Sequence, residues 1–182
     1  VVLVQAAAGG VGLILCQWAK HLGATVLGTV GSEAKAALAR SHGCDHPILY
    51  RQDDFAEAVM ELTGGAGVTV VYDAVGKDTF EKGLGVIAER GWMVVYGQAS
   101  GPVPPLDTLR LASKGINVTR GALGLFVRDP AYRATSAAEL FGLIADGVLK
   151  VEINQRYPLA ETARAHADLE GRKTTGSTVL DP

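Results

Sequence analysis

Hydrophobic and polar positions along this chain form two alternating kinds of segment. Short, continuous apolar runs occur at 1–5, 25–30, 47–49, 68–72, 92–96 and 116–119. Such runs are typical of parallel strands that are buried on both faces. Between the runs, apolar residues recur every three or four positions, which predicts amphipathic helices. Because strand and helix alternate with a period of about 20–25 residues, the pattern predicts βαβ units around a parallel sheet.

The predicted helices begin and end at residues that suit helix termini. We expect helices over 11–22, 33–42, 55–62, 80–87, 106–114 and 130–146. Ser32 is the expected N-cap of the second helix, and Gly43 its end. Asp129 and Pro130 begin the last helix, and Gly147 ends it. Six strands with these helices between them predict an α/β fold with a doubly wound parallel sheet of the Rossmann type.

The pattern changes after Gly147. A strand over 151–157, a helix over 161–170 and a strand over 177–180 form a β-α-β tail. Because six strands already complete the sheet, we expect this tail to belong to a neighbouring catalytic domain. We therefore divide the chain into a nucleotide-binding domain at 1–149 and a segment of the second domain at 150–182. The chain also starts inside an apolar strand without Met, so we expect it to be a piece of a longer protein.

Composition excludes several classes of protein. The chain has 182 residues, 48% of them hydrophobic, and a net charge of −2, which disfavours disorder. Its 17 basic residues face 19 acidic ones without a basic run, so nucleic acid is not an expected partner. No apolar stretch reaches about 18 residues, and no secretory leader is visible, so no membrane association is expected. Two cysteines are too few for a disulfide scaffold and favour the cytoplasm.

A glycine-rich turn lies between the first strand and the first helix. Ala7, Gly9 and Gly12 occupy the three small-residue positions of the dinucleotide fingerprint, with Gly10 and Val11 between them. In such a turn the backbone approaches a diphosphate, and free N–H groups at the helix start bind it. The alternatives are a purely structural turn and a site for S-adenosylmethionine, which usually has an acidic residue at the end of strand two; none is present there.

The end of the second strand indicates which dinucleotide is bound. An NAD site would have Asp or Glu there, whereas this chain has Gly31 and Ser32. Lys35 stands where a capping box would have Glu or Gln, and its charge opposes the helix dipole. A bound anion would reverse that effect, and the 2′-phosphate of NADPH is such an anion. A solvated surface lysine is the alternative.

Other chemistry-bearing residues have simpler interpretations. His42, Cys44, Asp45 and His46 cluster in the sequence, but Gly43 interrupts them and no fourth ligand pairing follows, so we expect no metal site. Asp73 follows a strand and precedes a glycine turn. We interpret its carboxylate as a turn or cap group rather than a general base.

Several further motifs resemble one family of oxidoreductases. In chain order they are 6–12 followed by 13–20, then 28–30, 71–76, 97–102, 118–120, 164–166 and 175–177. They cover essentially the whole chain and resemble the quinone oxidoreductases, the zinc-independent, NADPH-dependent members of the medium-chain dehydrogenase/reductase superfamily that are similar to zeta-crystallin. The resemblance implies hydride transfer from NADPH to a quinone or a related enone. It also implies a GroES-like catalytic domain, which the tail would help to complete.

The resemblance also implies a role for individual residues in holding the cofactor. Gly9, Gly10, Val11 and Gly12 would hold the diphosphate; Gly31, Ser32, Lys35 and Tyr50 would surround the 2′-phosphate; Arg172 would reach the phosphates from the tail; and Tyr96, Gly97, Gln98 and Leu123 would lie beside the ribose and nicotinamide. The simpler alternative for the two tyrosines is an aromatic at a strand end, and for Arg172 a cation at a helix end. No residue of this chain is expected to act as an acid or base.

Two other functions remain open at this stage. Another zinc-free reductase of the same superfamily, such as an enoyl-thioester reductase, would differ mainly in residues outside this chain. A non-catalytic nucleotide-binding or crystallin-like protein would bind NADPH without turnover. The resemblance further implies a homodimer, and we expect the strand edge at 116–119 to be its seam.

Overall fold

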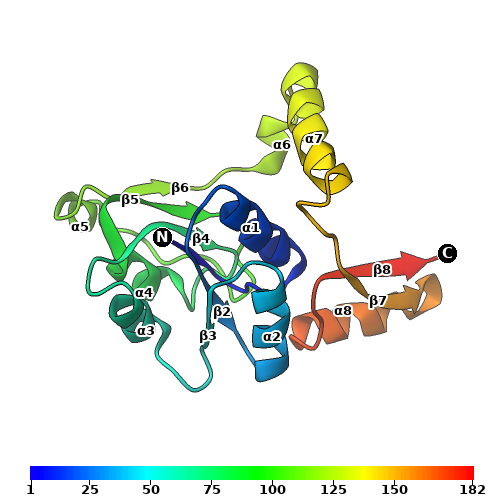
Figure 1. The fold of residues 1–182 in the computed structure, drawn as a ribbon, viewed down its shortest axis with the longest axis horizontal. Helices are drawn as coiled ribbons and strands as arrows, with labels where there is room; N and C mark the ends of the chain where they lie inside the picture. The colour runs from blue at the N-terminus through cyan, green and yellow to red at the C-terminus, as the bar shows by residue number, and fades with distance from the viewer.

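The computed structural model describes all residues from 1 to 182 and contains one six-stranded parallel sheet (Figure 1). Its strands are β1 (Val2–Val4), β2 (Val26–Val30), β3 (His46–Leu49), β4 (Val68–Asp73), β5 (Ile87–Val95) and β6 (Asn117–Thr119). The order is β3-β2-β1-β4-β5-β6, and every neighbouring pair is parallel. This arrangement confirms the predicted doubly wound sheet. The strand order reverses between β1 and β4, which is where such sheets bind ligands.

The two faces of the sheet carry separate hydrophobic cores. The helices of this part are α1 (Gly10–His21), α2 (Glu33–Ser41), α3 (Phe55–Leu62), α4 (Phe80–Gly85) and α5 (Leu109–Ala112). Neighbouring residues of a strand point to opposite faces, so Leu3 packs in the core under α3 and α4, and Val4 in the core under α1 and α2. Full burial of each such side chain stabilises the fold by roughly 1.5–3 kcal/mol.

Two predicted helices are shorter in the structure, and the one expected over 106–114 forms only as α5, Leu109–Ala112. The helix expected over 80–87 ends at Gly85, and Ile87 begins β5, where it pairs with Val68. Gly83 and Gly85 weaken the helix because glycine loses the most backbone freedom there, whereas the β-branched Ile87 is fully buried in the sheet. The strand therefore starts five residues before Trp92, the residue at which it was predicted to begin.

The tail forms a second, smaller unit beside the sheet. It contains β7 (Ile153–Pro158), the 3-10 turn η1 (Leu159–Glu161), α8 (Thr162–Glu170) and β8 (Ser177–Asp181). Strands β7 and β8 pair in parallel with each other and not with the main sheet, as Figure 1 shows. The predicted β-α-β order is thereby confirmed. The N–H of Gly176 donates to the carbonyl of Ala8 at 3.0 Å, so the tail reaches the glycine turn.

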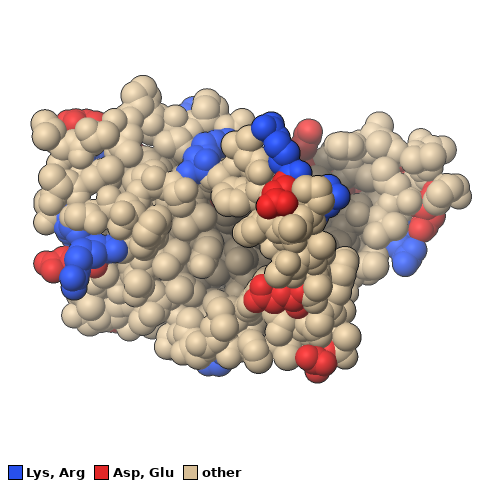
Figure 2. All heavy atoms as spheres, turned by 90° about the horizontal axis from the view of Figure 1, so that it is seen from above, with Lys and Arg blue, Asp and Glu red and all other residues tan.

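The surface combines scattered charges with one exposed apolar helix. On the face seen in Figure 2, acidic and basic side chains are interspersed rather than gathered by sign. The short α6 (Leu123–Phe126), which was not predicted, and the long α7 (Pro130–Ala145) project from the sheet and bury none of their residues. Phe141 of α7, a helix for which the apolar periodicity predicts one apolar face, is 63% exposed. None of the helices has both the length and the apolar character that crossing a bilayer requires.

Candidate nucleotide-binding site

The glycine turn brings the start of α1 against the end of β1. A Cβ on Gly12 would lie 2.3 Å from the carbonyl oxygen of Ala6, so only glycine permits this close approach. The N–H groups of Gly10, Val11 and Gly12 make no hydrogen bond within the chain. Three unpaired donors at a helix start attract an anion, because the helix dipole adds positive charge there.

The tail crosses the same turn on one side. Gly9 and Gly176 form a parallel bridge, and a Cβ on Gly10 would lie 3.2 Å from the carbonyl oxygen of Gly176. These contacts occupy the carbonyl of Ala8 but leave the donors of the helix start free. The tail therefore frames the turn without pairing the N–H groups that a ligand would need.

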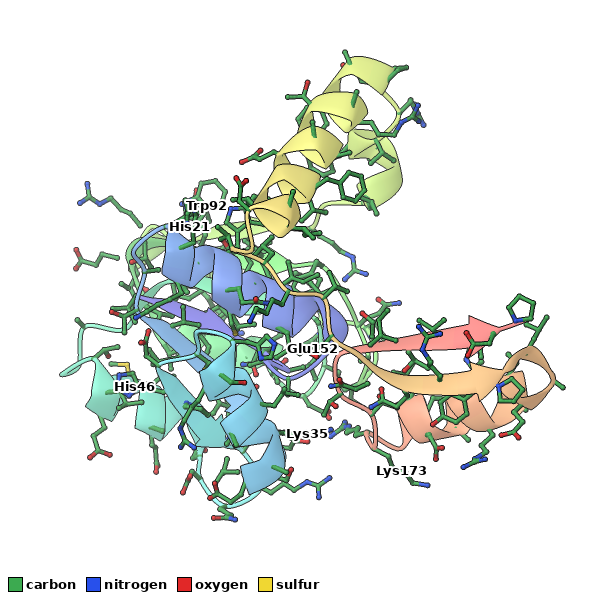
Figure 3. The ribbon with its side chains drawn as sticks, turned by 45° about the vertical axis from the view of Figure 1, so that its right-hand side comes forward. His21, Lys35, His46, Trp92, Glu152 and Lys173 are labelled. Carbon is green, nitrogen blue, oxygen red and sulfur yellow. The ribbon has the colours of Figure 1, made fainter.

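Lys35, Tyr50 and Arg172 come together at the end of β2, although the first and last are 137 residues apart. Lys35 reaches from α2 toward the loop between α8 and β8 (Figure 3), and its Nζ donates to the carbonyl oxygen of Arg172 at 2.7 Å. A Cβ on Gly31 would lie 3.0 Å from the Tyr50 hydroxyl, so glycine leaves room for that phenol. The Ser32 hydroxyl accepts the Lys35 N–H at 3.3 Å, which confirms the predicted cap.

The pKa values of Lys35 and Tyr50 respond to burial and to the guanidinium groups nearby, one of which, on Arg172, also lies 3.9 Å from the Asp78 carboxylate. Burial is the largest effect lowering the pKa of Lys35, and the charges of Arg51 and Arg172 lower it further, while Tyr50 acts in the opposite direction. Burial acts to raise the pKa of the Tyr50 hydroxyl, but the two guanidinium groups outweigh it and lower that pKa. A bound dianion would stabilise the positive charges of Lys35, Arg51 and Arg172, and would oppose ionisation of Tyr50. Sequence reasoning missed Arg51, whose signal was a basic residue two positions after strand three.

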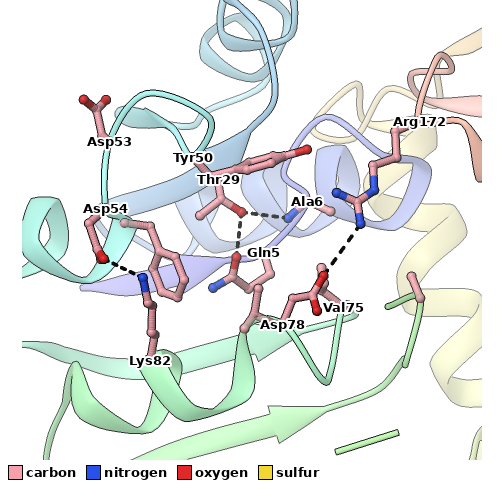
Figure 4. Close-up of a pocket in the computed structure, with 13 residues that line it drawn as sticks. Gln5, Ala6, Thr29, Tyr50, Asp53, Asp54, Val75, Asp78, Lys82 and Arg172 are labelled. Carbon is pink, nitrogen blue, oxygen red and sulfur yellow. Dashed lines mark hydrogen bonds and ion pairs between the residues drawn. The ribbon is translucent and has the colours of Figure 1, made fainter. Parts of the chain in front are cut away.

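A cavity of about 320 Å³ adjoins this cluster at the carboxyl edge of the sheet (Figure 4). Gln5 and Thr29 line it from the ends of β1 and β2, and Val75 from the loop after β4. Tyr50 and Arg172 belong both to the cavity wall and to a cationic cluster, which consists of Lys35, Arg51 and Arg172 around the Tyr50 phenol. Its volume lies at the lower end of the range of about 300–1,000 Å³ that is common for ligand pockets.

Asp73 organises the loop after β4. Its carboxylate is fully buried and accepts the N–H groups of Val75 and Gly76 at 2.7 and 3.0 Å, and the hydroxyl of Thr79 at 2.9 Å. This confirms the interpretation of Asp73 as a turn residue. The loop in turn supplies one wall of the cavity.

The end of β5 lies close against the end of β4. A Cβ on Gly97 would lie 2.5 Å from the carbonyl oxygen of Ala74, so this position also requires glycine. Burial, with the charge of Asp73 as a smaller cause, raises the pKa of Tyr96. The side chain of Gln98 is exposed and accepts a hydrogen bond from Arg120 at 3.0 Å.

Leu123, the last of the predicted nicotinamide contacts, is 75% exposed at the start of α6. The sequence pattern predicted no helix or strand at this position, whereas the structure has the short helix α6. Its predicted role therefore depends on a contact that a bound ligand or another part of the protein would have to supply.

The residues that cluster in the sequence around Gly43 are spread apart in the structure. His42 is buried, and its Nε2 lies 3.1 Å from Glu152 of the tail. His46 lies exposed on β3, well away from Glu152 in Figure 3. Cys44 is buried in the core under α2. Nowhere in the chain do three or more His, Cys, Asp or Glu side chains gather closely enough to hold a metal ion.

Comparison with known proteins identifies relatives over the whole chain. The zinc-binding dehydrogenase family matches residues 10–141. A quinone oxidoreductase from Pseudomonas aeruginosa is 52% identical over 182 residues, which are 100% of this chain and 56% of that protein. A 2-haloacrylate reductase from a Burkholderia species is 46% identical and is covered to 55%. The chain thus spans little more than half the length of these curated relatives.

Solved structures agree with these relatives. A mycobacterial protein complexed with NADPH is 50% identical, with a TM-score of 0.95. The match covers 100% of this chain and 56% of that protein's chain. The Escherichia coli quinone oxidoreductase complexed with NADPH is 46% identical with a TM-score of 0.94 and the same coverage. Together these relatives confirm the resemblance to quinone oxidoreductases that the sequence motifs indicated.

Proposed function

Because this chain belongs to the zinc-binding dehydrogenase family, we propose that it is the NADPH-binding part of an oxidoreductase that passes hydride to a quinone or a related enone. The observation that carries the proposal is the cationic cluster of Lys35, Arg51 and Arg172 around Tyr50, beside the unpaired N–H groups of the glycine turn. A 2′-phosphate distinguishes NADPH from NADH, and this cluster offers it a matching charge.

The diphosphate of the cofactor would bind at the glycine turn. Gly9, Gly10, Val11 and Gly12 present their backbone there, and the donors of the last three are free. Gly12 supports this role because its missing side chain brings the helix start to the strand end. Both features suit a diphosphate, which needs close backbone approach as well as positive charge.

The 2′-phosphate would bind between Gly31, Ser32, Lys35, Tyr50 and Arg172. Charge-assisted hydrogen bonds from ammonium and guanidinium groups to phosphate are about twice as strong as neutral ones. Lys35 lies at the start of α2 and opposes the helix dipole, so an anion bound beside it would improve the electrostatics of both.

The nicotinamide end would lie beside Tyr96, Gly97, Gln98 and Leu123. When bound, the reduced nicotinamide supplies the hydride. The residues of this chain would orient the ring and exclude water, and we assign none of them as an acid or base. The carboxyl ends of β4 and β5 support this placement, because ligands bind at that edge of doubly wound sheets.

The chain would contribute to two domains of a longer enzyme. We propose a cofactor domain at 1–149 and, at 150–182, a segment of a GroES-like catalytic domain; the separate pairing of β7 with β8 supports this division. We further propose a cytoplasmic homodimer with its seam along the free edge of β6. Strand β6 supports the latter because it pairs only with β5.

A second acceptor class has support of its own. The Burkholderia relative is named a 2-haloacrylate reductase, and its substrate class is an activated alkene rather than a quinone. Both reactions would use the same cofactor site, so the residues of this chain favour neither acceptor. The choice depends on the other wall of the substrate cleft.

Cofactor binding is tested by titrating the chain with NADPH and with NADH. Binding is followed by resonance energy transfer from tryptophan to the reduced nicotinamide. We expect NADPH to bind at least about tenfold more tightly, because one charged hydrogen bond contributes roughly 1.5–3 kcal/mol. Equal affinity for the two cofactors would overturn the assignment of the cationic cluster.

The acceptor is tested with the longer protein that contains this chain. NADPH oxidation is measured with a quinone, an enone, a 2-haloacrylate and an enoyl thioester. We expect turnover with the quinone or the enone. Tight NADPH binding without turnover of any acceptor would favour a non-catalytic protein instead.

A further inference from the structure

The amide nitrogen of Gln5 is buried without a partner. Gln5 lies at the end of β1 and is only 1% exposed, yet its Nε2 makes no hydrogen bond. No other buried side-chain nitrogen or oxygen in the chain is left unpaired in this way. Because an unpaired buried donor destabilises a fold, such a group requires an explanation.

A relay of hydrogen bonds fixes the orientation of this amide. The backbone N–H of Ala6 donates to the Thr29 hydroxyl at 3.1 Å, and that hydroxyl donates to Oε1 of Gln5 at 2.6 Å (Figure 4). The N–H of Ala6 can only donate, so it occupies a lone pair of the hydroxyl and leaves the hydroxyl proton for Gln5. The amide oxygen is thereby held toward Thr29, and both N–H groups of Gln5 point away from it.

Gln5 is one of the residues that line the 320 Å³ cavity, although its Nε2 is almost fully covered in the free chain. Tyr50 and Arg172 line the same cavity and also form the cationic cluster. In the proposed binding mode the 2′-phosphate lies on that cluster and the diphosphate on the glycine turn. The base attached to the same ribose is then the part of the cofactor that can enter the cavity.

We propose that Gln5 is a positioning residue that recognises the purine base by donating from Nε2 to one of its ring nitrogens. The inference rests on the proposed cofactor site and adds to it a base-recognising residue. Ring nitrogens of adenine accept hydrogen bonds, which complements a side chain whose amide oxygen is already paired and whose N–H groups are not. Thr29 acts through Gln5, because its hydroxyl holds the amide in the donating orientation.

The test uses adenosine 2′,5′-bisphosphate, which carries the base and the 2′-phosphate but no nicotinamide, and isothermal titration of the chain. We expect Gln5→Leu to weaken binding about 3- to 10-fold, the value of one neutral hydrogen bond. Gln5→Glu keeps the shape but replaces the donor with an acceptor, and should weaken binding at least as much. Circular dichroism melts show whether each variant is folded.

Analogues of the ligand locate the contact. The 1-, 3- and 7-deaza forms of adenosine 2′,5′-bisphosphate each replace one ring nitrogen with carbon. We expect the wild-type chain to bind one of them about 3- to 10-fold more weakly than the parent, and Gln5→Leu to cause no further loss with that analogue. The wild-type series alone tests the contact if a variant does not fold.

The possible failures are distinguishable. If the wild-type chain does not bind adenosine 2′,5′-bisphosphate, the proposed cofactor site is wrong and the inference is overturned with it. If the parent ligand binds but Gln5→Leu leaves its affinity unchanged, only the role of Gln5 is overturned. An equal loss with all three deaza analogues would likewise overturn it, because no single ring nitrogen would then be the acceptor of the Gln5 amide.

Discussion

At the scale of single residues, α1 can lie close to the end of β1 because Gly12 has no side chain. A Cβ on Gly12 would meet backbone atoms of Ala6 and Ala7 at 2.3 and 2.9 Å, and backbone cannot rotate away as a flexible side chain can. Gly142 in α7 differs, since nothing lies within 4 Å of the position of its Cβ. The two glycines therefore form a matched pair for the same substitution.

We expect Gly12→Ala to lower the free energy of unfolding by about 1–3 kcal/mol, because α1 must shift away from β1. Binding of NADPH should fall with it, as the donors of the helix start move. Gly142→Ala should instead raise the free energy of unfolding by about 0.5–1 kcal/mol. Denaturant titration measures both, and equal effects of the two substitutions would contradict the packing argument.

Lys35 tests the choice of cofactor at the same scale. Lys35→Glu places a carboxylate where an anion is expected, so the affinity for NADPH should fall by about tenfold or more while that for NADH stays within about twofold. Lys173→Glu is the control, because the Lys173 ammonium pairs with Asp168 and takes no part in the cluster. A similar loss with both variants would mean that general charge, and not a contact, governs the affinity.

The pH dependence of binding follows from the lowered pKa of Lys35. Affinity for NADPH should be full while Lys35 is protonated in the free chain, and should fall as pH rises through its pKa, which lies below 10.5. Lys35→Arg keeps the charge at every accessible pH, so most of this fall should disappear. Titrations between neutral pH and 10.5 measure the effect; an unchanged profile in Lys35→Arg would assign it to Tyr50, whose pKa is also lowered.

At the scale of elements, the sequence predicted where helices begin better than it predicted what packs against them. Ser32 and Asp129 both cap helices as expected, because their side chains satisfy N–H groups that lie within three residues. The exposure of Phe141 could not be predicted, since periodicity shows that a helix has an apolar face but not whether this chain contains its partner. Ile87 fits a helical spacing, yet the sheet overrides that pattern.

The loop after β4 shows how one carboxylate holds an element. Asp73 accepts two backbone N–H groups and one hydroxyl, so Asp73→Ala should lower the free energy of unfolding by about 2–4 kcal/mol. Asp107 is exposed, and its carboxylate accepts only the N–H of Leu109. Asp107→Ala should therefore lower the free energy of unfolding by less than about 1 kcal/mol. If Asp73 were instead a general base, its substitution would reduce turnover in the longer enzyme and leave stability unchanged.

At the scale of the whole molecule, the candidate site joins segments that local patterns cannot connect. The glycine turn was found from its spacing, and Arg172 from the family resemblance alone. Thr29 and Gln5 were not singled out as site residues, because their relay depends on two strands being side by side in register. Arg51 was identified only from the structure, in which its charge lowers the pKa of Lys35.

The contact between the tail and the glycine turn leads to a prediction about the complete site. Gly176 has a positive φ of 55°, and a Cβ there would lie 2.6 Å from the carbonyl oxygen of Glu152. Gly176→Ala should therefore loosen the tail and withdraw Arg172 from the cationic cluster, so that NADPH affinity falls about tenfold, as it should for Arg172→Ala.

A double-mutant cycle decides whether the two residues act together. If Gly176 acts through Arg172, the double variant should bind NADPH no more weakly than Arg172→Ala alone, because the contact can be lost only once. Losses that add would mean that the tail supports the site by another route. An unchanged affinity in Gly176→Ala would show that the cluster holds Arg172 in place without the tail's contact to Ala8, so isothermal titration of the three variants separates these cases.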